Sequence, residues 1–122
     1  MPRRLCILCV DDEEAALALR RKVLDEAGYL VFTAATVSDA LAFFKSHQPV
    51  DLVITDHLLR GATGSDLALE LRRVNPNLPV LTLSGGPTPN GVVQAPDYCL
   101  HKLEGPAEMI AKVQSILLAR EQ

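Results

Sequence analysis

Aromatic residues are scarce in this chain. It has no tryptophan, three phenylalanines and two tyrosines among its 122 residues. Leucine, valine, isoleucine and alanine must therefore fill most of the core. Hydrophobic residues make up 48% of the chain, and this share, together with the length, is sufficient for one folded unit. We expect a single domain over residues 1–122.

The chain also lacks an excess of charge. Its formal net charge is −3, so no general electrostatic attraction to nucleic acid or to anionic membranes is expected. No apolar run is long enough to span a bilayer. The basic start of the chain leads only to the short run Leu5–Val10, which stops at acidic residues, unlike a secretory signal. We expect a cytoplasmic protein with no direct contact to nucleic acid or membrane.

Cysteines are few, and their number argues against a disulfide framework, because three is odd. Cys6 and Cys9 form a Cys-x-x-Cys motif, but they lie within a predicted strand. Positions three apart on a strand point to opposite faces, so the two thiols are poorly placed to share a metal or a disulfide. We expect both, and Cys99, to pack in the core as small apolar residues.

Short apolar runs alternate with amphipathic segments along the chain. The apolar runs predict buried strands over residues 5–10, 30–33, 51–55, 78–83 and 98–100. The amphipathic segments predict four helices. One covers residues 14–27, one begins at a cap at Thr36, one ends at about residue 74, and one runs from residue 105 onward. This alternation predicts an α/β fold with a flavodoxin-like, doubly wound, five-stranded parallel sheet in the order 2-1-3-4-5.

Two details of the predicted helices concern which side chains face the core. In the first helix, the spacing places Ala16, Leu19, Val23 and Ala27 on one apolar stripe. In the helix that ends near residue 74, Leu67, Leu71 and Val74 are expected to face inward. Glycines and prolines are dense over residues 85–97, so we expect the fourth helix to be shortened or absent.

Polar side chains follow four of the predicted strands. Asp11 and Asp12 follow the first strand, and Asp56 ends the third. Ser84 ends the fourth, and Lys102 follows the fifth. Ligands of an open parallel sheet bind beyond the carboxyl ends of its strands, at the point where the strand order reverses. We therefore expect three carboxylates, a hydroxyl and an ammonium group to meet at one edge.

Such a cluster predicts a divalent cation. Neighbouring carboxylates repel one another unless a cation is present or a pKa is raised. Hard oxygen ligands favour Mg²⁺, and no cysteine or histidine group has the ligand spacing of a zinc site. A carboxylate beside Mg²⁺ can attack a phosphoryl group and form an acyl phosphate. Taken alone, the Asp11–Asp12 pair is explained better as a helix cap, so the prediction rests on the convergence of all the strand ends.

The chain resembles the receiver domain of two-component response regulators over essentially its whole length. The resemblance rests on the Asp-Asp pair at 11 and 12 after a valine, on Asp56 after an apolar strand, on Gly64, on Ser84 before two glycines, and on Lys102. It implies one receiver (response regulatory) domain that takes a phosphoryl group from a phosphohistidine of a sensor histidine kinase or a histidine phosphotransfer protein.

The resemblance also implies roles for individual residues. Asp56 is the implied phosphoacceptor, and Asp11 and Asp12 are the acidic pair that holds Mg²⁺ or Mn²⁺ together with Asp56. The backbone carbonyl of Leu58 is implied as a further metal ligand. The remaining implied roles are the switch hydroxyl for Ser84 and contact with the phosphoryl group for Lys102.

Three positions depart from the family pattern. Leu103 stands where a proline, often with a cis bond, usually follows the lysine. A cis bond without proline costs about 2.5–4 kcal/mol, so we expect a trans bond and a shifted loop. Cys99 stands where an aromatic residue often moves with the switch hydroxyl, and strand alternation places Tyr98 on the other face. Arg60 stands where the family commonly has proline.

These departures from the family pattern concern how the domain would pass its signal on. In this family, the face built from the fourth helix, fifth strand and fifth helix often mediates homodimerisation or output, and we expect that face to be remodelled here. Output is expected through protein contacts or through a domain outside this sequence. The chain is not expected to be an enzyme beyond promoting its own aspartyl phosphorylation and dephosphorylation.

Two alternative functions stay open. The first is a degenerate receiver that acts as a phosphorylation-independent protein-binding module, favoured by Leu103, Cys99 and the irregular segment 85–97. The second is a flavodoxin-like or hydrolytic enzyme. Flavin binding fits less well because the acidic loop after the first strand repels a phosphate unless a metal intervenes. A hydrolase that uses Asp56 fits less well because 122 residues leave little room for a cap over the cleft.

His57 is expected to be a solvated loop histidine, with a catalytic acid as the weaker explanation. The basic run from Arg20 to Lys22 is also expected to be solvated, with docking of an acidic partner as the weaker explanation.

Overall fold

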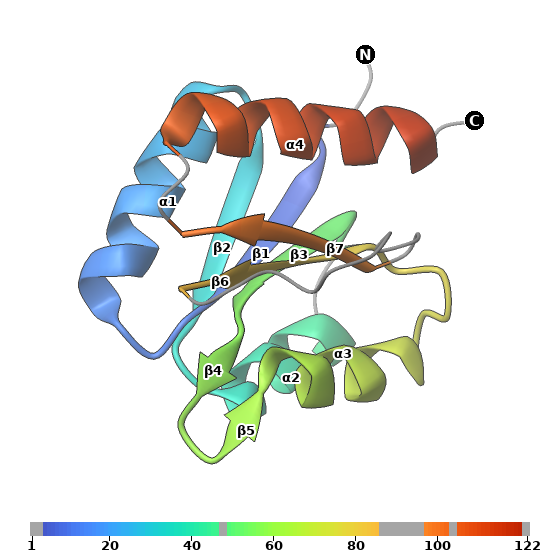
Figure 1. The fold of residues 1–122 in the computed structure, drawn as a ribbon. Helices are drawn as coiled ribbons and strands as arrows, with labels where there is room; N and C mark the ends of the chain where they lie inside the picture. Colours follow the sequence, from blue (N-terminus) through green and yellow to red (C-terminus); the bar gives the residue numbers. More distant parts are fainter. Residues whose placement is uncertain (1–3, 47–48, 86–96, 103–104, 121–122) are drawn as a thin grey trace.

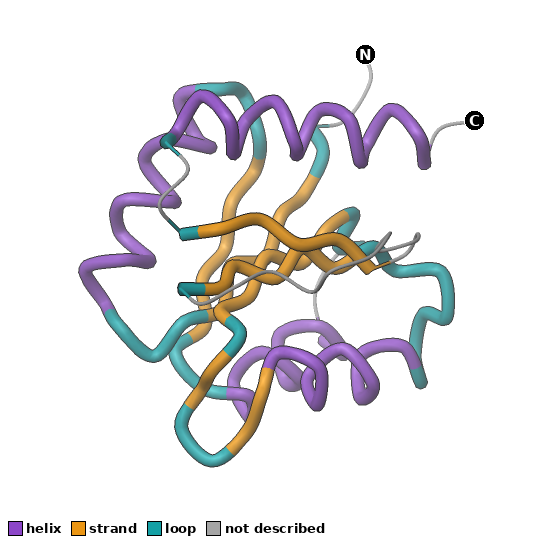
Figure 2. Tube along the Cα trace, viewed as in Figure 1, coloured by secondary structure: helices purple, strands orange, loops and turns teal. Residues whose placement is uncertain are grey.

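A five-stranded parallel sheet forms the centre of the protein (Figures 1 and 2). The computed structural model describes residues 4–46, 49–85, 97–102 and 105–120. The sheet strands are β1 (Cys6–Val10), β2 (Leu30–Ala34), β3 (Leu52–Asp56), β6 (Val80–Ser84) and β7 (Asp97–His101). Their spatial order is β2-β1-β3-β6-β7, and every pairing is parallel. The predicted flavodoxin-like order is confirmed.

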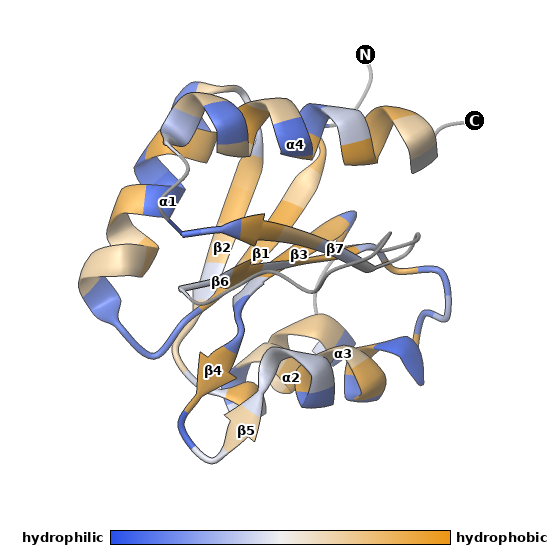
Figure 3. Cartoon of the chain, in the orientation of Figure 1, coloured by the Kyte–Doolittle hydropathy of each residue, from blue (hydrophilic) through white to orange (hydrophobic). Residues whose placement is uncertain are grey.

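Helices cover both faces of this sheet. They are α1 (Glu14–Glu26), α2 (Val37–Ser46), α3 (Gly64–Arg72) and α4 (Pro106–Arg120). Figure 1 shows α2 and α3 on one face, and α1 and α4 on the other. All residues of β1 and β3 are buried, as expected for strands covered on both faces. Figure 3 shows hydrophobic residues along the strands between the two helix layers.

Strand alternation divides the core into two clusters. Cys6 packs with Ala40 and Leu67 on the side of α2 and α3. Cys9 packs with Leu24 and other residues on the side of α1 and α4. The prediction that the two cysteines point to opposite faces is confirmed.

The ends of the helices follow local sequence signals. Thr36 Oγ1 accepts a hydrogen bond of 3.0 Å from the N–H of Asp39, which confirms the predicted cap of α2. Gly28 adopts a positive φ of 101° just after α1, a conformation that glycine adopts without strain. At the start of α3, Thr63 and Asp66 form a reciprocal capping box.

The predicted inward faces of two helices were partly wrong. In α1 the buried residues are Leu17 and Leu24, whereas Leu19 is exposed and Val23 lies at the edge of the buried stripe. The helix carries alanine or leucine on several sides, so the sequence supports more than one apolar stripe. Val74 is exposed because α3 ends at Arg72, before the turn that would have directed Val74 inward.

A short hairpin follows β3, in a segment where no strand was predicted. β4 (Leu58–Leu59) and β5 (Ala62–Thr63) pair antiparallel, and Gly61 at their turn has a φ of 74°. Two-residue strands are too short to produce a recognisable alternation, so the sequence pattern did not reveal them.

Some predictions concern residues outside the described part of the chain. The shortened or absent fourth helix falls on residues 86–96, and the trans bond and shifted loop fall on Leu103. Both stay predictions. Within the described ranges, no helix has the length and apolar character needed to cross a bilayer.

Candidate functional site

The strand register brings the predicted site residues to one edge of the sheet. Val10 pairs with Thr55, so Asp11 and Asp56 follow this pair on adjacent strands. Asp56 pairs with Leu83, which places Ser84 one position further along the next strand. Ser84 in turn pairs with His101, directly before Lys102, whose N–H donates to the Ser84 carbonyl at 2.8 Å.

Three carboxylates form the centre of this edge. One oxygen each from Asp11, Asp12 and Asp56 lies within 4.8 Å of the other two. Asp11 and Asp56 are buried, and Asp12 is half-buried. Two oxygens bound to one Mg²⁺ at about 2.1 Å each lie at most about 4.2 Å apart. The cluster is therefore close to the span of a single ion, and its hard oxygen donors fit Mg²⁺ or Mn²⁺.

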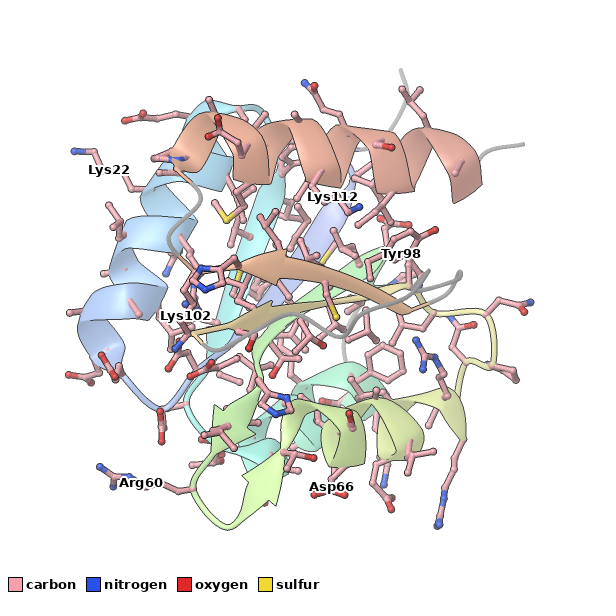
Figure 4. All side chains as sticks on the ribbon, in the orientation of Figure 1. Lys22, Arg60, Asp66, Tyr98, Lys102 and Lys112 are labelled. Atoms are coloured by element: carbon pink, nitrogen blue, oxygen red, sulfur yellow. The ribbon has the colours of Figure 1, made fainter. Side chains whose placement is uncertain are left out.

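Each of these carboxylates also has a basic side chain of the protein nearby. Lys102 Nζ lies 2.9 Å from Asp56 Oδ1, and Arg60 Nε lies 3.9 Å from Asp12 Oδ2. Figure 4 shows Lys102 beyond the end of β7 and Arg60 at the tip of the β4–β5 hairpin. The Arg60 side chain is 90% exposed, so water screens its contact with Asp12. The Lys102 side chain is only 35% exposed, so its contact with Asp56 is screened less.

The third cation, Arg20, was not identified as part of the site from the sequence. Its Nη1 atom lies 2.7 Å from Asp11 Oδ2, and the two side chains are 12% and 1% exposed. Arg20 was predicted to be solvated, and that prediction was wrong. The sequence does contain the signal: Arg20 is three residues after Leu17 and four before Leu24, on the stripe that α1 buries. The error was to interpret Arg20 as part of a solvated basic run.

Asp11 is held from a second side. Its Oδ1 atom accepts a hydrogen bond of 3.0 Å from the N–H of Glu13, and Oδ2 receives Arg20. The same charges reach Cys9 on the preceding strand. Burial raises the pKa of the Cys9 thiol to about 12; the positive charge of Arg20 opposes the shift, and the negative charge of Asp11 reinforces it.

The backbone around Asp56 is packed closely against Gly64. A Cβ atom at Gly64 would lie 2.7 Å from the Asp56 carbonyl oxygen and 3.0 Å from Thr55 Cγ2. The N–H of Gly64 donates to the His57 carbonyl at 2.9 Å, and Thr55 Oγ1 donates to the Asp56 carbonyl at 3.0 Å. The start of α3 thus supports the strand end that carries Asp56, and only glycine fits at this approach.

The remaining predicted residues occupy the same region. Ser84 is half-buried at the end of β6. Leu58 begins β4, two residues after Asp56, with an exposed side chain; ligation by its carbonyl stays a prediction. His57 is exposed, in agreement with the expectation of a solvated histidine.

The aromatic residue of β7 faces away from the position of Cys99. Tyr98 packs with the cluster under α1 and α4, and Lys112 Nζ lies 5.7 Å from the centre of its ring. Because adjacent residues of a strand point to opposite faces, Cys99 lies on the side of α2 and α3. The predicted placement of Tyr98 on the other face is confirmed.

Comparison with known proteins gives consistent results. The family model of the response regulator receiver domain matches residues 7–114. The transcriptional regulatory protein GlrR of Escherichia coli is 32% identical over 117 residues, which cover 95% of this chain and 26% of GlrR. The alkaline phosphatase synthesis transcriptional regulatory protein SphR of Synechococcus elongatus is 32% identical, with 91% of this chain and 48% of SphR covered. The chain thus spans half or less of these relatives.

A solved structure supports the same assignment. The response regulator receiver protein from Sinorhizobium medicae superposes with a TM-score of 0.84 at 30% identity, and the match covers 97% of this chain and 98% of that chain. The matched family model covers most of the chain and includes every residue of the acidic cluster. The chain therefore belongs to the receiver domains of two-component response regulators.

Proposed function

We propose that this receiver domain accepts a phosphoryl group on Asp56, with Mg²⁺ or Mn²⁺ bound at the acidic cluster. The donor is a phosphohistidine on a sensor histidine kinase or a histidine phosphotransfer protein. The observation that carries the proposal is the convergence of three carboxylate oxygens within 4.8 Å, with Lys102 at 2.9 Å from Asp56.

The divided roles of the three carboxylates follow from their surroundings. Asp12 is half-buried, and its ion-pair partner within the described part of the chain is the distant, exposed Arg60, so it is the most available oxygen ligand for an incoming ion. Asp56 would act both as a ligand and as the nucleophile. The Leu58 carbonyl, two residues further along, would add a neutral ligand. The bound cation would neutralise charge on the cluster and on the phosphoryl oxygens.

The transfer itself needs little beyond positioning and charge. An oxygen of the Asp56 carboxylate forms a bond to phosphorus, and the P–N bond to the donor histidine breaks. The bonding electron pair stays on the imidazole nitrogen. This nitrogen takes up a proton from solvent, so the donor leaves as neutral imidazole. The ammonium group of Lys102 balances negative charge beside the acceptor, and the Ser84 hydroxyl donates a hydrogen bond to the phosphoryl group.

The phosphoryl group of the product would carry about −1.5 to −2 charges. It replaces the −1 charge of the Asp56 carboxylate, so the edge of the sheet would gain about −0.5 to −1 in net charge. That charge can bias the arrangement of the loops around Ser84 and Lys102 and so alter a protein-binding face. Because the chain spans only part of relatives named as transcriptional regulatory proteins, we place output in protein contacts or in a further domain. The chain's own chemistry is limited to its phosphorylation and dephosphorylation.

One observation favours the alternative of a phosphorylation-independent binding module. Each carboxylate of the cluster already has a basic side chain of the protein within 3.9 Å, so the cluster has internal charge compensation. A receiver that had lost metal binding could persist in this form.

Labelling by a small phosphodonor separates the two functions. We expect incubation with acetyl phosphate and Mg²⁺ to add the mass of one phosphoryl group, detected by intact mass spectrometry. Asp56→Asn should abolish the added mass, and the matched variant Asp25→Asn, in an exposed residue at the far end of α1, should retain it. Equal labelling of Asp56→Asn and the unaltered protein would exclude Asp56 as the acceptor, and no labelling under any donor would favour the binding module.

A further inference from the structure

Arg20 is a charged residue on the buried side of a helix. It lies on the stripe of α1 that also contains Leu17 and Leu24, and its side chain is only 12% exposed. Buried charges persist in proteins when they are paired, because an unpaired one carries a large desolvation cost. The pairing partner here is Asp11, a member of the acidic cluster.

The contact of Arg20 differs from those of the other two cations at the site. Arg60 is 90% exposed and 3.9 Å from its carboxylate, and Lys102 is 35% exposed. Arg20 is the least exposed of the three and has the shortest distance, 2.7 Å. Water and salt therefore screen its charge the least.

The same contact fixes the orientation of Asp11. Oδ2 receives Arg20, and Oδ1 accepts the N–H of Glu13 at 3.0 Å, so both carboxylate oxygens are engaged within the chain. A cation that binds directly to Asp11 has to share an oxygen with one of these donors. Among the described residues, neither Asp12 nor Asp56 has an ion pair as short and as buried as the one that Arg20 makes with Asp11.

Arg20 also borders a cleft beside the site. A cleft of about 300 Å³ between α1 and α4 is lined by Asp11, Arg20 and Lys102, together with apolar residues such as Leu100 and Met109. Arg20 and its partner Asp11 thus both border this cleft.

We infer that Arg20 is a positioning residue that holds Asp11 in place and lowers the affinity of the acidic cluster for a divalent cation. Metal binding then depends mainly on Asp12 and Asp56. The inference rests on the proposed metal site. Its physical reason is that a buried guanidinium beside the cluster repels a dication and cancels the charge of one of its three carboxylates.

The test is a calorimetric Mg²⁺ titration of the unaltered protein and of Arg20→Gln. Removing one full charge next to a dication should tighten Mg²⁺ binding by about tenfold. Arg21→Gln makes the same change of net charge at the next residue, which is exposed, and should leave the Kd within about twofold. Arg20→Lys retains the positive charge, so its Kd for Mg²⁺ should stay near that of the unaltered protein. Equal Kd values for Arg20→Gln and Arg21→Gln, or weaker binding by Arg20→Gln, would overturn the inference.

A second pair of variants covers the case in which Arg20→Gln does not fold. Asp11→Asn leaves Arg20 without its carboxylate, whereas Asp11→Asn combined with Arg20→Gln leaves no buried charge at this position. The double variant should bind Mg²⁺ about tenfold more tightly than Asp11→Asn alone, and equal or weaker binding contradicts the inference.

In the folded Arg20→Gln variant, the amide proton resonance of Glu13 should also shift, because its acceptor Asp11 is released on one side.

The outcomes distinguish this inference from the proposed function. If Asp56 is labelled but Arg20→Gln binds Mg²⁺ with the same Kd as the unaltered protein, the inference fails alone. If Arg20→Gln binds Mg²⁺ more tightly but no variant is labelled, the proposed phosphoryl transfer fails and the role of Arg20 stands. If neither the unaltered protein nor Arg20→Gln binds Mg²⁺, the inference is rejected.

Discussion

Lys102 Nζ lies 2.9 Å from Asp56 Oδ1, although the two residues follow different strands of the sheet. The parallel register from β3 through β6 to β7 produces this contact, because Asp56 pairs with Leu83 and Ser84 pairs with His101. The lysine is thus placed by the sheet itself and not by the loop that follows it. This matters because Leu103 replaces the usual proline in that loop.

Loss of the Lys102 charge should slow phosphorylation without abolishing metal binding. A charge-assisted contact to the phosphoryl group contributes about 1.5–3 kcal/mol, so Lys102→Gln should lower the labelling rate by roughly 10- to 100-fold. The rate is measured by intact mass over time at saturating Mg²⁺. Lys22→Gln, in an exposed residue of α1, is the matched control, and equal rates for the two variants would show that the ammonium group has no part in the transfer.

A methyl group at Gly64 should disturb the acceptor strand. Gly64→Ala places a Cβ atom 2.7 Å from the Asp56 carbonyl oxygen, which belongs to backbone that cannot rotate away. We expect a loss of about 1–3 kcal/mol in the free energy of unfolding, measured with urea, and a lower labelling rate. Of the residues that the structure describes, Gly105→Ala meets the flexible end of Glu108 at 3.2 Å, and it should change stability less. Equal stabilities of the two variants would mean that the close approach is not constraining.

The Arg20–Asp11 pair should contribute to stability in a way that Mg²⁺ can replace. In the presence of EDTA, Arg20→Gln leaves a buried carboxylate without its partner and should lower the free energy of unfolding by about 3–5 kcal/mol. Because the variant is expected to bind Mg²⁺ more tightly, its Tm should rise more with added Mg²⁺ than that of the unaltered protein. Thermal unfolding of Arg21→Gln provides the reference; a Tm response of Arg20→Gln no larger than this reference contradicts the prediction.

The buried thiol of Cys9 predicts a loss of stability at alkaline pH. Its pKa is raised from 9.0 to about 12 by burial, so between these values the unfolded chain loses the thiol proton and the folded chain keeps it. The folded state then binds more protons than the unfolded state. The contribution of Cys9 to the free energy of unfolding therefore falls by up to about 1.4 kcal/mol per pH unit above pH 9. Below pH 9 this contribution is constant.

The variant Cys9→Ala isolates this effect. Urea unfolding at pH 8 and pH 10 should show a smaller loss of stability for Cys9→Ala than for the unaltered protein. Burial also raises the pKa of Tyr29, so part of the alkaline loss should persist in the variant. The same pH dependence in both proteins would show that Cys9 does not titrate differently in the folded and unfolded states.

Much of the fold could be predicted because its signals are unambiguous. β1 and β3 are continuous apolar runs, and the alternation within them placed Cys6 and Cys9 on opposite faces. The α1 stripe was harder, because its alanines and leucines allow several inward faces, and burial of Leu17 and Leu24 is decided by the tertiary packing. The β4–β5 hairpin was missed because two residues cannot establish a period.

The candidate site shows the same division. The convergence of Asp11, Asp12 and Asp56 was predictable, because parallel strands end at one edge of the sheet. The contact of Arg20 with Asp11 depends on the rotation of α1 about its axis, which the sequence pattern did not resolve. A basic residue within an apolar stripe is therefore a useful sign of a buried partner, provided that the stripe is placed correctly.

The most direct test is to locate the acyl phosphate. Borohydride converts an aspartyl phosphate to homoserine, and peptide mass spectrometry can identify the residue that is converted. After incubation with acetyl phosphate and Mg²⁺, we predict homoserine at position 56 and none when EDTA replaces Mg²⁺. Conversion at another aspartate, or conversion at position 56 that is equal with and without the metal, would contradict the proposal that Asp56 accepts the phosphoryl group at a divalent-cation site.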